Sequence, residues 1–317
     1  MPKPLVSIVS INYNQAQVTC EMVFSLRKIT YPNIEIIVVD NASPSEAPDL
    51  IEEQCPEVKL IRSSVNLGYA GGNNLGVMQA KGEYILFLNN DTEVEPGFLE
   101  PLVDLFEHNA KAGVASPKII YHNTDSMIQY AGSHGINAWT GRSITIGQFE
   151  KDKGQHNVSR ATALADGAAM MVPMRVIQQV GLMPELYFLY YEELDWCEIM
   201  KRAGYSCHYV ADSTIYHKES VSVGKFSVLK TYYMNRNRLL FIRRNMSGWK
   251  RWSSALVFLL AALPKKVLTH GARQEWKHLK ALQQGLWWHL ANNAACEPKK
   301  LKPTQPSVSE ELALNQL

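Results

Sequence analysis

Short runs rich in Val, Ile, Leu and aromatic residues alternate with amphipathic segments from residue 5 to residue 121. The runs end abruptly at polar side chains, as strands buried on both faces of a sheet do. They cover residues 5–11, 34–39, 58–61, 84–88 and 113–121. Apolar positions with helical spacing lie between them, at residues 18–26, 44–54 and 96–108. This alternation predicts an α/β fold, a mostly parallel sheet with helices on both faces.

The pattern changes after residue 121. Glycines fall among aromatic and polar residues from 122 to 160, and we expect short strands and loops there that cover a site or receive a second substrate. An apolar segment at 165–172 leads into a short helix that ends at Gly181. An aromatic run at 186–191 then precedes a helix that ends between Lys201 and Gly204, and a strand follows at 205–210.

Polar side chains follow three of the predicted strands directly. Asn14, Asp40 and Asp91 each lie at or just beyond a strand end. Ligands of open α/β sheets bind in the crevice outside the carboxyl ends of the strands. Because right-handed crossovers bring parallel strand ends to one edge, we expect these three residues to form a site.

Each carboxylate at this edge has two interpretations. Asp91 is either a hard oxygen ligand for Mg²⁺ or Mn²⁺ carrying a diphosphate, or a helix N-cap or turn former before Pro96. Asp40 either accepts the N3–H of a uracil or thymine ring or forms an Asx-turn with Ser43. These residues alone leave both alternatives open.

A glycine-rich stretch spans residues 66–76 and matches neither the P-loop nor the dinucleotide fingerprint. Gly68, Gly71, Gly72 and Gly76 remove side chains where a backbone approaches a ligand closely. The other interpretation is a flexible turn that leads into a helix.

Three acids follow the aromatic run, at Glu192, Glu193 and Asp195. Acids in the first turn of a helix complement its dipole, and this alone would explain them. The other interpretation is a carboxylate near a desolvated aromatic wall, with a pKa raised enough for a general base. His217, after the next strand, is either a structural residue or a ligand.

Composition limits the class of protein. Hydrophobic residues make up 46% and charged residues 20%, as in an ordinary globular chain. The formal net charge of +2 gives no reason to expect nucleic acid as a partner. Five scattered cysteines without a CxxC pair argue against a disulfide framework or a zinc site. With no signal-peptide pattern at the N-terminus, we expect a cytoplasmic protein.

The last third of the chain mixes cations, aromatics and apolar runs. The segment 232–244 is either a helix with a solvated basic face or a binding segment for a diphosphate or an anionic lipid. The apolar stretch 254–263 falls short of the about 20 residues that span a bilayer. Because Lys250, Arg251, Lys265 and Lys266 flank it, we expect an interfacial helix on anionic lipid.

Five tryptophans in this region suit an interface as well as they suit packing on the rest of the protein: Trp249, Trp252, Trp276, Trp287 and Trp288. We expect an α/β domain at 1–222; its division into a donor-binding half at about 1–120 and an acceptor or catalytic half at about 121–222 is what the family resemblance given below implies. A helical membrane-associated region follows at 223–296. The Pro, Lys and Ser content from residue 297 predicts a disordered tail at 297–317.

Taken in order, the motifs resemble family 2 glycosyltransferases. They are VSIVSINYN at 6–14, VVDNAS at 38–43, NLGYAGGNN at 66–74, LNNDT at 88–92, YEELD at 191–195 and YH at 216–217. The chain is most similar to the rhamnosyltransferase-like branch of bacterial polysaccharide synthesis. The resemblance covers roughly residues 5 to 245.

This resemblance implies a Rossmann-like GT-A fold, a nucleotide-diphosphate sugar donor, Mn²⁺ or Mg²⁺, and inversion at the anomeric carbon. The metal ligands would be Asp91 and His217, with Asn89 in place of the family's first aspartate. The implied donor-binding residues are Tyr13, Asn14, Asp40, Asn41, Gly68, Tyr69, Asn73, Asn74, Asn90 and Asp91. Asp40 among them would hold the pyrimidine base.

The family's catalytic aspartate corresponds to Glu193, which is one methylene longer, with Asp195 as the fallback base. The implied acceptor-binding residues are Asp166, Gly167, Glu192 and Trp196. In the implied mechanism the acceptor hydroxyl attacks in line while Glu193 takes its proton. The metal stabilises the departing diphosphate. A glycoside hydrolase would use two carboxylates on opposite sides of the sugar. Glu192 and Glu193 are adjacent in the sequence, which argues against hydrolysis.

The expected function is transfer of a sugar, with rhamnose favoured, from a dTDP- or UDP-sugar to a saccharide. The acceptor would be linked to a polyprenyl diphosphate, in O-antigen or capsule synthesis. The protein would be peripheral on the inner face of the plasma membrane. An alternative is a non-catalytic nucleotide-sugar-binding or regulatory protein, supported by the departures at Asn89 and Glu193. A nucleotidyltransferase would want a basic glycine-rich N-terminal loop, which is not found.

Overall fold

The computed structural model describes residues 3–45, 48–218 and 227–292. Within these residues one mixed sheet follows the order β10-β12-β6-β11-β4-β1-β2-β3, with β5 paired to β12 and β7 to β6. Its strands are β1 (Val6–Asn12), β2 (Ile34–Asp40), β3 (Lys59–Arg62), β4 (Tyr84–Leu88), β5 (Thr92–Val94), β6 (Ala112–Tyr121), β7 (Ile128–Tyr130), β10 (Arg160–Thr162), β11 (Ala169–Pro173) and β12 (Ser206–His217). A separate hairpin joins β8 (Ser133–Ile136) to β9 (Ser143–Thr145).

The strands of the N-terminal third are parallel, as predicted. β1 pairs in parallel with both β2 and β4, and β2 with β3. β11 then enters antiparallel between β4 and β6, and β5 and β10 pair antiparallel with β12. The later strands therefore make the sheet mixed, and they carry the chain back to the strand ends that hold Asp40 and Asp91.

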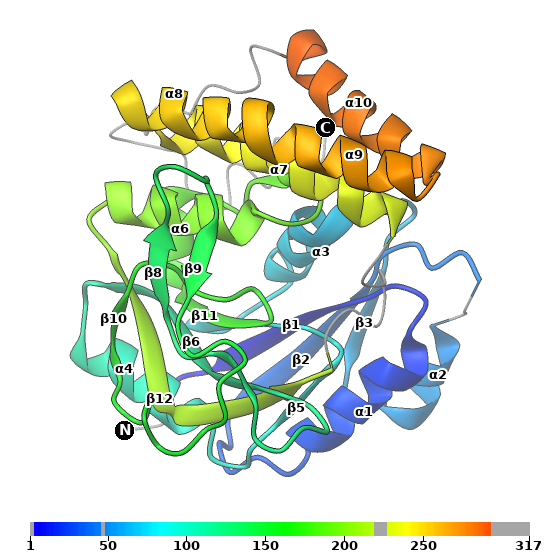
Figure 1. The fold of residues 1–317 in the computed structure, drawn as a ribbon. Coiled ribbons are helices and arrows are strands. Elements are labelled where there is room, and N and C mark those ends of the chain that lie inside the picture. The colour runs from blue at the N-terminus through cyan, green and yellow to red at the C-terminus, as the bar shows by residue number, and fades with distance from the viewer. Residues whose placement is uncertain (1–2, 46–47, 219–226, 293–317) are drawn as a thin grey trace.

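Helices cover both faces of the sheet (Figure 1). They are α1 (Ala16–Leu26), α2 (Asp49–Gln54), α3 (Gly68–Val77), α4 (Leu99–His108), α5 (Met174–Val180) and α6 (Glu192–Arg202). Alternate residues of β4 divide between two cores, as strand geometry requires. Leu86 packs with α1, α2 and α4, whereas Phe87 packs with α3, α5 and α6.

The glycine-rich stretch is the buried helix α3 itself, not a turn that leads into a helix. A Cβ atom at Gly76 would lie 2.4 Å from Cγ1 of Val9, and one at Gly72 would lie 2.9 Å from Cδ1 of Ile11. These two glycines therefore let α3 pack directly on β1. Close approach to the sheet, not to a ligand, explains them.

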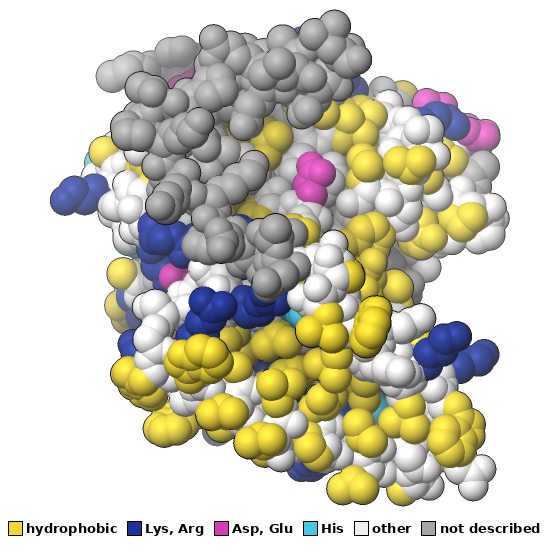
Figure 2. All heavy atoms as spheres, turned by 90° about the horizontal axis from the view of Figure 1, so that it is seen from above, with side chains coloured by type: hydrophobic (Ala, Val, Ile, Leu, Met, Phe, Trp, Pro, Cys, Tyr) yellow, Lys and Arg dark blue, Asp and Glu magenta, His cyan; other side chains and the backbone are white. Residues whose placement is uncertain are grey.

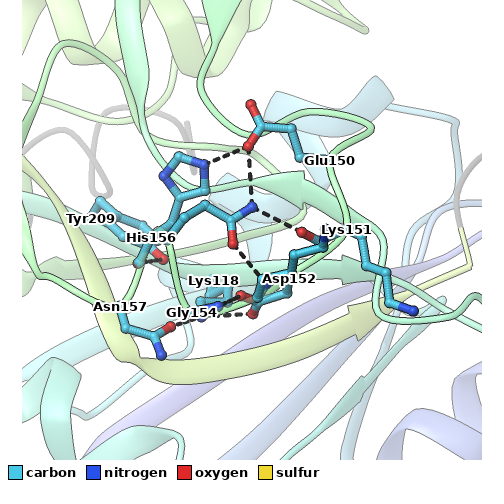
Figure 3. A network of polar contacts seen from close by, with 10 residues as sticks. Lys118, Glu150, Lys151, Asp152, Gly154, His156, Asn157 and Tyr209 are labelled. Carbon is cyan, nitrogen blue, oxygen red and sulfur yellow. Dashed lines mark hydrogen bonds and ion pairs between the residues drawn. The ribbon is translucent and has the colours of Figure 1, made fainter.

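Residues 122–160 form β7 to β9 and loops, in agreement with the prediction. The loop at 150–157 is tied to the sheet by a polar network (Figure 3). Lys118 of β6 is 5% exposed, and its Nζ lies 2.8 Å from Oδ2 of Asp152. The Tyr209 hydroxyl of β12 donates to the carbonyl of His156 at 2.8 Å. A buried ion pair and a buried tyrosine thus hold this loop on β6 and β12.

The C-terminal helices lie together on one side of the molecule, over α6 and α3 (Figure 1). They are α7 (Val228–Asn245), α8 (Gly248–Val257), the π-helical turn Phe258–Ala262, α9 (Leu263–Ala272) and α10 (Trp276–Ala291). Leu240 and Phe241 of α7 form a core with Tyr187 and Tyr191 of the aromatic run. α7 therefore packs directly on the segment that precedes α6. The predicted tail at 297–317 lies outside the described residues.

The apolar stretch at 254–263 is not as short as its sequence predicts. It lies inside one continuous helix of 25 residues, Gly248–Ala272, which is long and apolar enough to cross a membrane by length and composition. Only 6% of its apolar window is buried. The sequence argument counted residues 254–263 alone, whereas the helix continues through Lys250 and Arg251 at one end and Lys265 and Lys266 at the other. An interfacial position for it stays a prediction.

Candidate active site

Four side chains connect the ends of β1, β2 and β4. Asn12 Nδ2 donates to Oδ1 of Asp40 at 2.8 Å, and Thr19 Oγ1 donates to Oδ1 of Asn12 at 2.9 Å. Asn90 Nδ2 donates to Thr19 Oγ1 at 3.0 Å. All four are buried. The strand ends thus meet at one edge, as the crossover argument predicted, and Thr19 of α1 joins them.

Asp40 forms the Asx-turn that sequence left as an alternative. The amide and hydroxyl of Ser43 donate to its two oxygens, at 3.2 Å and 2.6 Å. Ser43 Oγ also accepts from the amide of Asn14 at 2.9 Å, which brings residue 14 to this edge with a φ of 53°. Tyr13 lies beside it, half-buried. Oδ2 of Asp40 accepts only the Ser43 amide among the hydrogen bonds of the described residues, so it keeps acceptor capacity for a base N–H.

Three of the predicted donor-binding amides hold the protein's own backbone. Asn41 accepts from the amide of Leu67 and donates to the carbonyl of Gly68, both at 2.9 Å. Asn74 exchanges hydrogen bonds with the backbone of Met183 at 2.9 Å and 3.0 Å. Asn73 donates to the carbonyl of Tyr69 at 3.1 Å. These side chains are already paired, so they shape the site around α3.

Gly68 and Tyr69 connect α3 with the segment before α6. The amide of Tyr69 donates to the carbonyl of Phe188 at 2.6 Å. Gly68 has a φ of +72°, and a Cβ there would lie 2.3 Å from that same carbonyl oxygen. The position therefore requires glycine for both conformation and space. Gly68 thus lies against the backbone of Phe188, and its contact with a donor stays a prediction.

Asp91 and His217 form a buried pair at the end of β4. His217 Nε2 lies 3.0 Å from Oδ1 of Asp91, and each residue is 6% exposed. The antiparallel pairing of β12 with β5 places His217 opposite Thr92. Oε1 of Gln129 lies 2.9 Å from Nδ1 of His217, which orients the ring and directs Nε2 toward Asp91. Asn89 Nδ2 lies 3.5 Å from Nε2.

This pair suits a divalent cation. Two neighbouring ligands of an octahedral cation, each about 2.1 Å from the metal, lie about 3.0 Å apart, and 3.0 Å is the separation found here. The described residues contain no group of three His, Cys, Asp or Glu side chains that would hold a metal alone. A cation at this pair would take its other ligands from water and phosphate oxygens, as Mg²⁺ commonly does.

Glu193 lies across the site, at the start of α6. Its Cγ and Cδ are 3.4 Å and 3.7 Å from where a Cβ of Gly167 would be. The Tyr69 hydroxyl donates to the carbonyl of Gly167 at 2.6 Å. Asp166 precedes this glycine, and its Oδ1 accepts from the amide of Ala168 at 2.9 Å. α3, the 166–168 turn and α6 thus meet around one carboxylate.

Burial raises the pKa of Glu193 to about 7, and the negative charge of Asp166 adds to the shift. Burial, with the charge of Glu193, raises the pKa of Glu192 well above its usual range. Glu192 is 2% exposed, and its Oε2 has no hydrogen-bond partner within the described residues. Burial therefore disfavours the charged form of Glu192, whereas the pKa of Glu193 lies where a general base can exchange its proton near neutral pH.

Asp195 and Trp196 are structural residues. Asp195 is fully buried, and its Oδ2 accepts from Nε and Nη2 of Arg244, both at 3.0 Å, while Asn245 donates to Oδ1. Trp196 is 1% exposed, its Nε1 donates to the carbonyl of Gly181 at 3.0 Å, and its ring packs edge-on against Phe87. Both side chains are already held by other protein groups, so the acceptor role of Trp196 and the fallback-base role of Asp195 stay predictions, with Glu193 as the first base candidate.

The aromatic segment before α6 has an unusual backbone. Phe188, Tyr190 and Tyr191 have φ values of 63°, 70° and 79°, in the left-handed region that non-glycine residues rarely adopt. Strain of this kind concentrates at functional sites and persists where neighbouring structure enforces it. Here it sets the direction in which α6 begins, and with it the position of Glu193.

Two side chains of α7 hold this strained segment, and the sequence did not assign them this role. Arg236 and Asn237 are 6% and 0% exposed. Their donors reach four backbone carbonyls, those of Leu186, Tyr187, Leu189 and Tyr190, at 2.6–3.0 Å. The sequence predicts the segment 232–244 as either a helix with a solvated basic face or a binding segment for a diphosphate or an anionic lipid. Its Arg-Asn pair fixes the backbone that leads to Glu193.

Comparison with known proteins agrees with this geometry. The family model described as "Glycosyl transferase family 2" matches residues 7–177. An N-acetylglucosaminyl-diphospho-decaprenol L-rhamnosyltransferase of Mycobacterium tuberculosis is 23% identical over 270 residues, covering 77% of this chain and 86% of that protein. The dTDP-rhamnosyl transferase RfbF of Shigella flexneri is 24% identical over 267 residues, covering 80% and 86%.

A solved structure shares the fold over nearly the whole chain. The mannosyltransferase PcManGT of Pyrobaculum calidifontis, in complex with GDP-Man and Mn²⁺, superposes with a TM-score of 0.55 at 14% identity. The match covers 99% of this chain and 80% of that one. This similarity confirms the predicted GT-A architecture.

Proposed function

Because the chain belongs to glycosyl transferase family 2, and is a glycosyltransferase of GT-A fold, we propose that it is an inverting, divalent-metal-dependent enzyme that uses a dTDP- or UDP-sugar. Rhamnose is the favoured sugar, on the strength of the two rhamnosyltransferase relatives. The observation that carries this proposal is the position of Glu193, a half-buried carboxylate at the junction of α3 and α6, whose pKa is raised to about 7 by desolvation.

The acceptor side of the mechanism follows from that carboxylate. Ionised Glu193 accepts the proton of the acceptor hydroxyl as the oxygen attacks the anomeric carbon. Burial favours the neutral form of Glu192 beside it, which limits the negative charge at this position. Asp195 stays paired with Arg244 and fixes the first turn of α6. One base suffices for a single inverting displacement, so the reaction needs no nucleophile from the protein.

Asp91 and His217 would hold the divalent cation. When bound, the cation supplies Lewis-acid stabilisation of the charge on the departing diphosphate. Gln129 keeps the imidazole in the orientation that presents Nε2. On the donor side, Asp40 would receive the N–H of the pyrimidine base through Oδ2, with Tyr13 and Asn14 beside it and Asn90 beneath.

We propose a lipid-linked saccharide as the acceptor and the inner face of the plasma membrane as the location. One relative is named for a decaprenol-linked substrate. The C-terminal helices expose large apolar side chains: Trp249, Trp252, Leu256, Leu259, Leu260, Val267, Leu268, Trp276, Trp287 and Leu290. Figure 2 shows hydrophobic side chains spread over this side of the molecule, with Lys and Arg among them. Such a surface fits a membrane interface.

A donor screen tests the proposed function. The protein is incubated with dTDP-rhamnose, UDP-galactose, UDP-glucose or UDP-N-acetylglucosamine, with membrane extract as acceptor source, in Mn²⁺ or in EDTA. We expect release of one nucleoside diphosphate and transfer to lipid in Mn²⁺ only. Donor binding without turnover would indicate a non-catalytic nucleotide-sugar-binding protein instead.

A further inference from the structure

Three cations near the start of α6 have no carboxylate partner within the described residues. They are Arg142, in the turn between β8 and β9, Arg238 on α7 and Lys266 on α9. Arg238 is 3% exposed, and its Nε has no hydrogen-bond partner in the part of the chain that the structure describes. Its guanidinium stacks on the Phe258 ring at 4.9 Å.

These cations lie close enough to affect one another. A Cβ at Gly141, next to Arg142, would lie 3.9 Å from Nε of Arg238. Burial, together with the positive charges of Arg142 and Arg238, lowers the pKa of Lys266 to about 8. Lys266 Nζ donates to Oδ1 of Asn235, a neutral acceptor, at 2.7 Å. The cluster thus carries positive charge that no acidic side chain of the described residues offsets.

Buried charges in proteins are normally paired, since removing them from water is costly. An unpaired, buried guanidinium beside two more cations is therefore an arrangement for a bound anion. Phosphate oxygens suit it well, because the planar guanidinium donates two parallel hydrogen bonds to them. Beside the cluster, Lys266 also lines a cavity of about 390 Å³ with Lys230 and Arg273, and Glu275 is the one acidic residue in its lining.

The cluster lies between the base and the exposed apolar helix. Tyr191, the residue before α6, packs its ring 5.8 Å from that of Phe241 on α7, three positions after Arg238. Phe258 and Lys266 belong to the exposed helix Gly248–Ala272. Along the line from Glu193 to this helix, the Glu193 carboxylate comes first, then the three cations, and then the apolar surface. A lipid-linked saccharide has the matching order of sugar hydroxyl, diphosphate and isoprenoid chain.

We propose that Arg142, Arg238 and Lys266 bind the diphosphate of the lipid-linked acceptor and so place its saccharide at Glu193. This inference rests on the proposed function for the nature of the acceptor. It assigns the acceptor diphosphate a site separate from that of the donor diphosphate, which belongs with Asp91 and His217. The isoprenoid chain would then leave the protein along Gly248–Ala272.

A binding experiment tests this site without metal, donor or turnover. The probe is farnesyl diphosphate in EDTA, measured by calorimetry against wild type, R142Q and K266Q, with K280Q, an exposed lysine of α10, as control. We expect about tenfold weaker binding for R142Q and K266Q, the equivalent of one charge-assisted contact, and unchanged binding for K280Q. R238K, which keeps the charge but loses the planar fork, should also bind more weakly. Equal affinity in all variants would overturn the proposal.

Binding to phosphatidylglycerol vesicles distinguishes a site for the acceptor diphosphate from a site for an anionic lipid headgroup. The proposal predicts that R142Q and K266Q bind these vesicles as wild type does. A loss for vesicles as large as the loss for farnesyl diphosphate would make the cluster a headgroup site and contradict the proposal.

Kinetic measurements distinguish a failure of this inference from a failure of the proposed function. If the wild-type protein transfers sugar, the R142Q variant should show a KM for the diphosphate-linked acceptor about tenfold higher than wild type. Its kcat and its KM for the donor should be unchanged. Transfer by wild type without this KM change would overturn the site alone. Absence of transfer by wild type with every donor would overturn the proposed function, while farnesyl diphosphate binding still decides the site.

Discussion

Nε2 of His217 and Oδ1 of Asp91 lie 3.0 Å apart, although 125 residues separate them in the chain (217 − 91 − 1). The pairing of β12 with β5 brings them together, and Gln129 orients the imidazole. Asn89 occupies the position of a second carboxylate in the family motif, so a cation here would have one carboxylate and one imidazole from the protein.

The first prediction concerns this pair. His217→Ala removes one of the two ligand atoms, and we expect the Mn²⁺ concentration for half-maximal transfer to rise at least about 100-fold. Gln129→Ala leaves both ligands and disturbs only the ring orientation, so a smaller rise of about 10-fold is expected. Metal titrations of activity measure both. Equal metal dependence in wild type and His217→Ala would remove His217 from the metal site.

The second prediction concerns Glu193. Glu193→Gln keeps the shape of the side chain but cannot accept a proton, so kcat should fall about 10²- to 10⁴-fold with donor KM unchanged. Glu198→Gln is the matched control, because Glu198 lies on the same helix and pairs with Lys201. Steady-state rates distinguish the two variants, and comparable activity in both would show that Glu193 is not the base.

The pH profile gives a second readout of the same carboxylate. Because the base must be ionised, kcat/KM of wild type should rise with pH through about 7 and then level off. The folded state also binds this proton more tightly than the unfolded chain, whose glutamate has a pKa of 4.5. Glu193 therefore lowers folding stability as pH rises from 4.5 to about 7, and Glu193→Gln should remove that loss.

The third prediction separates Asp195 from catalysis. Asp195→Asn leaves the buried guanidinium of Arg244 without its counter-charge, and loss of one partner of a buried ion pair costs about 3–5 kcal/mol. Urea denaturation should show this loss. A variant with wild-type stability and no activity would instead restore Asp195 as a base.

The fourth prediction concerns the exposed helix. Trp252 and Leu260 are 69% and 74% exposed. Replacing both with Ser removes about 3 kcal/mol of apolar transfer, so vesicle binding should weaken about 100-fold. The exposed Val65 and Val158 of the catalytic domain serve as a matched double control. Extraction by alkaline carbonate is expected for a peripheral protein. Retention in the membrane would mean that Gly248–Ala272 spans it.

The sequence predicted most of the sheet, because buried strands leave a direct signature. The run that ends at Asp91 is the central strand β4, and the run that ends at Asp40 is β2, each within one residue of the prediction. The meeting of Asp40 and Asp91 at one edge followed from parallel pairing. Antiparallel β11 was not foreseen, since an apolar run does not specify its direction.

Within the site, spacing identified the chemistry but not the direction in which each side chain points. Asn41 and Asn74 fit a donor-binding motif in sequence, yet their amides hold the backbone of Leu67 and Met183. Trp196 follows three acids, and helical geometry turns it into the core against Phe87. Asn237 carried no signal, because the carbonyls it binds are recognised only in three dimensions.

The most direct test of the account is the anomeric configuration of the product. Wild-type enzyme, supplied with Mn²⁺, the donor identified by screening and a lipid-linked acceptor, is followed by NMR from the first turnover. A single in-line displacement assisted by Glu193 predicts a glycosidic bond of inverted configuration, with one nucleoside diphosphate released per bond formed. A product of retained configuration would require a covalent intermediate or a different geometry, and would contradict the account.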